Sequence, residues 1–276
     1  MGTRISSARI PEMLARLPAF PKVVPKLLDC LREDAPSLDS LALIARNDPV
    51  ISAAILSAAN RLRRMRALPD LSDLFSGASV IGFDKIRQII LSVGLNRFVS
   101  QGSGHIYFFE HSLAVAIVAQ ELAQLARISP AEAYVAGILH DIGQLVFFSE
   151  DAGAYRAIRR QATLAGDLLQ RETEVFGLDH SQLGVLMASF WNLPKSIMRA
   201  IGSHHDTITA WNDPLPAVIN LAESLARAMD LPPSPHGRVT SLNKSALEFL
   251  QLRWDSPEMA DCFGRCRARF TYARGL

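Results

Sequence analysis

The sequence predicts an all-α protein built as two helical lobes. Apolar residues recur at the spacing of a helix along most of the chain, and the alternation typical of a strand is nowhere sustained. Several stretches also begin with a helix-capping residue followed by proline, as in Asp48-Pro49 and Ser129-Pro130. A hydrophobic content of 49% over 276 residues is enough for a substantial core. We therefore expect a core formed by helices.

The first lobe is expected to be helical after an irregular, proline-punctuated start. Its expected helices cover residues 24–32, run from the cap Ser37 through Ile44, begin at Asp48-Pro49, and extend from Lys85 to Phe98 after Asp84. The small, polar and glycine-rich segment Gln101–Gly104 then follows a long apolar run. It predicts a boundary between a lobe of residues 1–102 and a lobe of residues 103–276.

The second lobe is expected to hold the remaining helices. They are predicted at residues 109–126, from Ser129 onward, near residues 154–165, at residues 167–176, from Asp179, from Pro194, from Pro214, and at residues 241–252 and 256–269. No internal repeat or low-complexity tract interrupts this pattern. The prediction is therefore a bundle of many short helices.

One stretch of the second lobe, Ala136–Leu145, places His140 beside Asp141 in an apolar helical run. Burying two strongly hydrated groups is costly unless they are paired or bind a metal. The helix is expected to begin at Ser129, with Glu132 closing a capping box, so His140 and Asp141 should lie about three turns into it. Neighbouring residues on a helix point roughly 100° apart, so other helices must complete any site around this pair.

Composition points to a soluble cytoplasmic protein. Lys and Arg number 29 against 27 Asp and Glu, a balance that neither requires nor excludes an anionic partner. The three cysteines lack metal-type spacing and indicate reduced thiols in the cytoplasm. No signal-peptide core and no apolar run long enough to span a membrane is present, so we expect no membrane association.

Histidines cluster in the second lobe: six of the seven fall between His105 and His205. A single helical histidine is most often hydrogen-bonded or partly exposed, but a set of them with carboxylates in apolar helices is a candidate metal site. The candidate residues are His111, His140, Asp141, His180, His204, His205 and Glu223. Such a histidine-rich set suits one or two ions of Fe, Mn, Ni or Zn better than Mg or Ca, whose sites are built from oxygen.

The order of these residues resembles the HD superfamily of metal-dependent phosphohydrolases. Within it, the chain is similar to the HDOD family of bacterial signalling proteins over roughly residues 11–230. The segments that carry this resemblance are Leu17–Pro21, Asn47–Val50, Leu56–Asn60 and Ala78–Phe83. The resemblance implies an HD-type helical bundle in the second lobe and a protein partner in a signalling pathway.

Position by position, the resemblance implies His111, His140 and Asp141 as ligands of one metal ion, with Asp141 also able to reach a second. It implies that His180, His204 and His205 hold the second ion. Catalytic relatives have Asp as the last ligand after Ala, whereas this chain has Glu223, which is one methylene longer. If the protein is an enzyme, Asp141 is the expected catalytic residue.

Two departures bear on activity. The resemblance implies Lys and a Gly-Tyr-Pro segment in relatives that hydrolyse cyclic di-GMP, where this chain has Gln144 and residues Thr207–Trp211. Cyclic di-GMP hydrolysis is therefore disfavoured. The arginines at positions 61, 63, 64 and 66 have no interleaved aromatic residues, so nucleic acid is a disfavoured partner as well.

Two functions remain open. In the first, the protein is a regulatory module whose site binds a metal or a nucleotide, or is vestigial, and whose output is a protein contact. In the second, it is an active metal-dependent phosphohydrolase that acts on a nucleotide or another phosphate ester. Glu223, Gln144 and the missing segment favour the first, and the otherwise complete ligand set keeps the second open.

Overall fold

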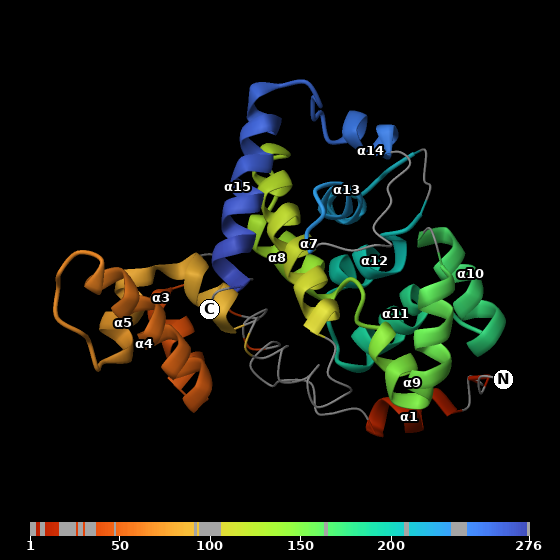
Figure 1. Cartoon of the computed structure of the whole chain (residues 1–276), viewed down its shortest axis with the longest axis horizontal. Helices are drawn as coiled ribbons and strands as arrows, with labels where there is room; N and C mark the ends of the chain where they lie inside the picture. The colour runs from red at the N-terminus through yellow and green to blue at the C-terminus, as the bar shows by residue number, and fades with distance from the viewer. Residues whose placement is uncertain are drawn as a thin grey trace. The chain divides into compact units, whose positions relative to one another are not determined.

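The computed structural model describes residues 4–5, 9–16, 26, 30, 37–46, 48–90, 93, 106–162, 165–206, 210–232 and 242–274. Across these residues the secondary structure is helical and contains no strand, which confirms the all-α class. Figure 1 labels the helices in chain order. The chain divides into two compact units, one of residues 19–101 and the other of residues 1–18 and 102–275.

The unit of residues 19–101 is built from short helices packed through aliphatic side chains. Its helices are α3 (Leu38–Arg46), α4 (Pro49–Arg64), α5 (Leu74–Ile81) and a further helical stretch over residues 83–90. Asp48 caps α4 as expected, since its carboxylate accepts hydrogen bonds from the amides of Val50 and Ile51. Helix α5, which Asp73 caps, was not predicted from the sequence. The helix expected at 24–32 falls largely outside the described residues.

The larger unit is organised around α7 (Ile106–Leu125), which packs against α8 (Pro130–Leu139), α13 (Pro214–Ala228) and α15 (Pro257–Arg274). Helices α7 and α8 approach so closely that a Cβ atom on Gly137 would lie only 2.6 Å from the Cα of Ala116. The other helices of this unit are α1 (Ile10–Arg16), α9 (Gln144–Gln161), α10 (Ala165–Phe176), α11 (His180–Phe190), α12 (Lys195–Ser203) and α14 (Lys244–Phe249).

The first residues of the chain contact the larger unit. The amide of Ile5 donates a hydrogen bond to the carbonyl of Phe176 at 2.7 Å, and Arg9 forms a 3.2 Å ion pair with Glu150. From the sequence these residues were expected to belong to the first lobe, and the division into lobes of residues 1–102 and 103–276 stays a prediction. No helix among the described residues has the length and apolar character needed to cross a membrane.

Candidate metal centre

The His140-Asp141 pair lies in a turn, which corrects the expectation that it sits inside a helix. Helix α8 ends at Leu139, His140 is its C-cap, and α9 begins at Gln144. Hydrogen bonds between residues three apart carry the chain through this turn, from the amide of Ile142 to Leu139 and from Gln144 to Asp141. Both side chains of the pair face the centre from this turn, and Nε2 of His140 lies 3.5 Å from Oδ2 of Asp141.

The turn passes close to the start of α11. A Cβ atom on Gly143 would lie 1.9 Å from the carbonyl oxygen of His180, so only glycine fits there.

The start of α8 also differs from expectation. Ser129 caps the helix as predicted, but the Glu132 carboxylate accepts a hydrogen bond from the Ser196 hydroxyl on α12 rather than closing a capping box. That contact joins α8 to the helix that leads to His204.

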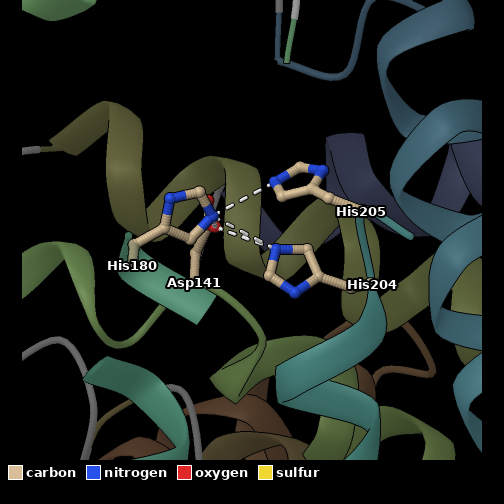
Figure 2. Close-up of side chains that lie close together, drawn as sticks. All are labelled: Asp141, His180, His204 and His205. Carbon is tan, nitrogen blue, oxygen red and sulfur yellow. Dashed lines mark hydrogen bonds and ion pairs between the residues drawn. The ribbon is translucent and has the colours of Figure 1, made fainter. Parts of the chain in front are cut away.

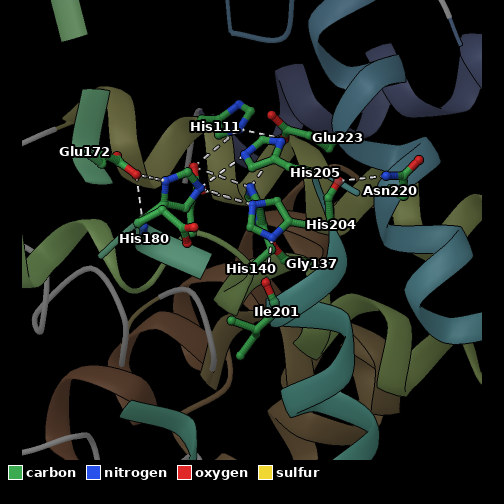
Figure 3. Close-up of polar contacts among 12 residues, drawn as sticks. His111, Gly137, His140, Glu172, His180, Ile201, His204, His205, Asn220 and Glu223 are labelled. Atoms are coloured by element: carbon green, nitrogen blue, oxygen red, sulfur yellow. Dashed lines mark hydrogen bonds and ion pairs between the residues drawn. The ribbon is translucent and has the colours of Figure 1, made fainter. Parts of the chain in front are cut away.

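Three of the predicted residues form what we call the Glu223 group: His111 from α7, His140 and Glu223 from α13. Nε2 of His111 lies 2.9 Å from Oε2 of Glu223, and Nε2 of His140 lies 3.3 Å from the same oxygen. Figure 3 shows Glu223 beside His111. The other carboxylate oxygen of Glu223 accepts a hydrogen bond from Arg227, one turn further along α13. The longer Glu side chain therefore spans from Arg227 to the two histidines, with one oxygen at each end.

The other four residues form the His180 group: Asp141, His180, His204 and His205. Figure 2 shows their side chains converging from the α8–α9 turn, the start of α11 and the end of α12. Nε2 of His180 lies 3.3 Å from Nε2 of His204 and 3.1 Å from Nε2 of His205. Within each group, one ligand atom from every residue lies within 4.8 Å of the others.

The Asp141 carboxylate faces both groups. Its Oδ2 lies 3.5 Å from Nε2 of His140 and 3.8 Å from Nε2 of His111. Its Oδ1 lies 3.1 Å from Nε2 of His180 and 3.4 Å from Nε2 of His204. One oxygen points to each side, which is the arrangement that a carboxylate adopts when it bridges two metal ions.

Backbone carbonyls hold two of the histidine rings. Nδ1 of His140 donates to the carbonyl of Gly137 at 2.7 Å, and Nδ1 of His204 donates to the carbonyl of Ile201 at 2.7 Å. A carbonyl oxygen can only accept, so Nδ1 must carry the proton in both rings. In the neutral ring, Nε2 then presents its lone pair to the centre, as a metal ligand requires.

One buried residue near the centre, Glu172 on α10, was missed by the sequence reading. Its carboxylate accepts hydrogen bonds from Nδ1 of His180 at 2.6 Å, from the backbone amide of His180 at 2.9 Å and from the Tyr155 hydroxyl at 2.8 Å. A signal was available in the sequence. Glu172 lies midway between Leu168 and Phe176, four residues from each, on the apolar side of its helix.

The buried carboxylates of the centre are held in their charged form. Burial would raise the pKa of Asp141, but His140 and His180 hold it well below its ordinary value. Burial would likewise raise the pKa of Glu223, but Arg227 and His111 hold it well below that of an exposed glutamate. Both carboxylates are therefore anionic at neutral pH, which is the form that binds cations.

The histidines divide into two electrostatic classes. Burial would lower the pKa of His140, but Asp141 and Glu223 raise it to about 10, and Glu172 and Asp141 similarly raise the pKa of His180 against the effect of its burial. Burial lowers the pKa of His204, and it lowers the pKa of His205 well below the ordinary value of a histidine. The surroundings of His140 and His180 thus favour positive charge, and His204 and His205 remain neutral.

Buried atoms without hydrogen-bond partners test whether a cation fits. Among the residues that the structure describes, Nε2 of His140, Oδ1 of Asp141 and Oε2 of Glu223 are fully buried and make no hydrogen bond of acceptable geometry. Such atoms are costly to bury without a partner. All three face the centre, and a divalent cation would satisfy them together. The donor set of imidazole nitrogens and two carboxylates fits Fe, Mn, Ni or Zn.

The structure thus brings together all the predicted residues: His111, His140, Asp141, His180, His204, His205 and Glu223. Their binding of metal stays a prediction. Glu223 does not overshoot the centre, because Arg227 anchors one of its oxygens and leaves the other beside His111. Gln144 is buried at the start of α9, and residues 207–209 of the segment after His205 lie outside the described residues.

Comparisons with known proteins place this fold and site in context. A Ribonuclease Y from Ureaplasma parvum is 27% identical over 64% of the chain and 32% of its own length. The chain spans less than half the length of the curated relatives that it matches. An HDOD domain protein of unknown function from Geobacter sulfurreducens superposes with a TM-score of 0.70 at 23% identity, over 94% of this chain and 87% of that one.

A candidate signal transduction protein from Marinobacter aquaeolei has a TM-score of 0.76 at 19% identity, over 98% of this chain and 61% of that one. At these identities the likeness shows the shared fold. The family assignment comes from the sequence, because the family model of the HDOD domain matches residues 17–207, which is more than half of the chain. The chain therefore belongs to the HDOD domain family.

Proposed function

We propose that this protein is a regulatory HDOD module in bacterial signal transduction whose centre binds two divalent metal ions. The observation that carries the proposal is the position of Asp141, which directs one carboxylate oxygen to each of two histidine groups. Its Oδ1 is buried and makes no hydrogen bond of acceptable geometry, and a cation bound between the two groups would give this oxygen a partner.

Each group would hold one ion. His111, His140 and Glu223 supply the donors on one side, and His180, His204 and His205 supply them on the other, with Asp141 shared between the two. The ordinary preference of imidazole-rich sites makes Fe, Mn, Ni or Zn the expected ions. A nucleotide phosphate could bind at the same centre, since the bound cations would attract it.

Family membership supports the regulatory role, and so does the naming of a similarly folded protein as a candidate in signal transduction. Gln144 stands where cyclic di-GMP hydrolases of the superfamily carry Lys, by the resemblance drawn from the sequence. We infer that the output of the module is contact with a protein partner, and that the state of the centre sets the conformation that the partner reads.

A metal-dependent phosphohydrolase is the second candidate, and one observation favours it. Oε2 of Glu223 lies among the histidines of its group despite the longer side chain, so the donor set is complete. Bound divalent ions would acidify water and stabilise negative charge on a phosphate ester. On the protein side, Asp141 would fix the spacing of the two ions, and the partly exposed His205 would line the side open to substrate.

Elemental analysis and hydrolysis assays test the two candidates together. The protein is purified without added metal, reconstituted with Mn²⁺ or Fe²⁺, and incubated with cyclic dinucleotides, guanosine tetraphosphate and simple phosphomonoesters. We expect about two ions per chain and little or no turnover. Absence of metal even after reconstitution would refute the metal centre. Robust hydrolysis that is lost in His140→Ala would replace the regulatory role with an enzymatic one.

A further inference from the structure

We propose that Glu172 is a positioning residue that fixes the ring of His180 with Nε2 aimed at the metal centre. This inference rests on the proposed metal-binding function. Glu172 is fully buried on α10, and it is absent from the set of candidate ligands because its carboxylate lies behind His180 rather than inside the centre (Figure 3). Its role would be to act through His180.

The carboxylate holds His180 at two points. One oxygen, Oε2, accepts from the backbone amide of His180 at 2.9 Å and from Nδ1 of its ring at 2.6 Å. The first contact fixes the backbone at the start of α11, and the second fixes the rotation of the ring. A carboxylate in its charged form only accepts hydrogen bonds, so Nδ1 must carry a proton and Nε2 is the nitrogen left for a metal.

A second layer of contacts holds Glu172 itself. The Tyr155 hydroxyl on α9 donates to Oε1 at 2.8 Å, so both oxygens of the carboxylate are occupied. The Tyr155 ring packs against Phe147 at 5.0 Å and Phe148 at 4.6 Å between ring centroids, and both Tyr155 and Glu172 are completely buried. This apolar surrounding excludes water, which would otherwise compete for the Nδ1 proton.

The support given to His180 differs in kind from that of its neighbours. Neutral backbone carbonyls hold His140 and His204, whereas an anionic carboxylate holds His180. A carboxylate behind an imidazole raises the basicity of the ligating nitrogen, and removal of such partners commonly weakens metal affinity by about 10- to 100-fold. Glu172 would therefore make His180 the strongest histidine donor of its group.

The test compares Glu172→Ala, Glu172→Gln and a matched control in full-length protein. The control is Glu121→Gln, which alters another buried carboxylate of the same unit, paired with Arg265 and Arg269 away from the centre. Two quantities are measured: the number of Zn²⁺ ions bound per chain with their dissociation constants, and the downfield NMR signal of the His180 Nδ1 proton, assigned with a His180→Ala variant.

We expect Glu172→Ala to lose the His180 signal and the Zn²⁺ ion of the His180 group. In Glu172→Gln the amide oxygen can still accept from His180 while the amide nitrogen donates to Tyr155, so the signal should remain and the affinity should fall by about 10- to 100-fold. Glu121→Gln should match the wild type in both measurements. A purely structural role for Glu172 would lower thermal stability without this split between the two variants.

Wild-type Zn²⁺ binding in Glu172→Ala would overturn the inference, and so would an unchanged His180 signal. If Glu172→Ala does not fold, wild-type affinity in Glu172→Gln has the same consequence. A wild-type protein that takes up no Zn²⁺ refutes the proposed metal function and this inference with it. The two failures are distinct, because the inference about Glu172 can fail while the wild type still binds Zn²⁺ normally.

Discussion

The two halves of the centre differ in how they are enclosed. The residues of the Glu223 group are all buried, with exposed fractions of 4% for His111, 0% for His140 and 3% for Glu223. In the His180 group, His180 and His204 are buried but His205 is partly exposed. Structural metal sites are closed, whereas sites that exchange ligands keep an open position. If both groups bind metal as proposed, this comparison predicts a closed, structural site at the Glu223 group and a more exchangeable one at the His180 group.

The charges behind the two groups also differ. A cation, Arg227, holds Glu223 from outside and draws negative charge away from its donor oxygen. An anion, Glu172, holds His180 and adds electron density to its donor nitrogen. The two sides thus share Asp141 but receive opposite support, which predicts ions of unequal affinity and exchange rate at the two positions.

The largest expected effect comes from removing the residue that both halves share. Asp141→Ala should abolish most metal uptake at both positions, because Asp141 alone directs one oxygen to each group and no neighbour on its turn can replace it. Elemental analysis after reconstitution with Mn²⁺ or Zn²⁺ measures the loss, with Glu121→Gln as the control. Retention of one ion per chain would mean that the groups bind metal independently.

Chelation should separate the two halves within the wild-type protein. In Zn²⁺-loaded protein we expect EDTA to remove one ion quickly and the other slowly, since the partly exposed His205 opens only the His180 group to solvent. His180→Ala should lack the fast phase and keep the slow one, and His140→Ala should do the reverse. A single phase for both ions would erase the proposed difference.

The sequence predicted the participants of the centre better than its local geometry. The resemblance supplied His111, His140, Asp141, His180 and the residues that follow, and the fold does bring them together. The chain around His140 was wrongly extended as a helix, because its apolar residues continue at helical spacing on both sides. The close approach of Gly143 to His180 dictates the turn there, and that contact joins residues far apart in the chain.

Glu172 shows why the supporting residues were harder to predict. It lies beside Arg171 and near Glu174 in an amphipathic helix, where a carboxylate would ordinarily face water. Its burial depends on the packing of α10 beside α9 and on the position of His180. The role of Arg227 was equally hard to predict. Arg227 lies one turn after Glu223 on α13, and its contact with that carboxylate matters only because Glu223 points into the centre.

An intermediate effect is expected from shortening Glu223. The Glu223→Asp side chain cannot hold Arg227 and face His111 at the same time, because the native side chain uses one oxygen for each. We expect affinity for the ion of the Glu223 group to fall by about tenfold, the lower end of losses from disturbed ligand support. Competitive titration with a Zn²⁺-binding dye measures it. An increase in affinity would show that Arg227 is dispensable and that Asp suits the site better.

The smallest effect should come from Tyr155→Phe, which removes one hydrogen bond from the support of His180 and keeps the aromatic packing. Glu172 would retain both contacts to His180, so Zn²⁺ affinity at the His180 group should fall by no more than about threefold, below the range for removing the carboxylate itself. The carboxylate oxygen left buried without Tyr155 should cost about 2 kcal/mol.

That cost should lower the Tm of the metal-free protein by about 4–8 °C. Thermal melts of Tyr155→Phe, Glu172→Ala and the double variant, each with and without Zn²⁺, measure how far the two residues act as one unit. Because the hydroxyl contributes through Glu172, the double variant should melt close to Glu172→Ala alone, with the two losses far from additive. Additive losses would show that Tyr155 stabilises α9 independently, and the difference between the two halves of the centre would then rest on Glu172 by itself.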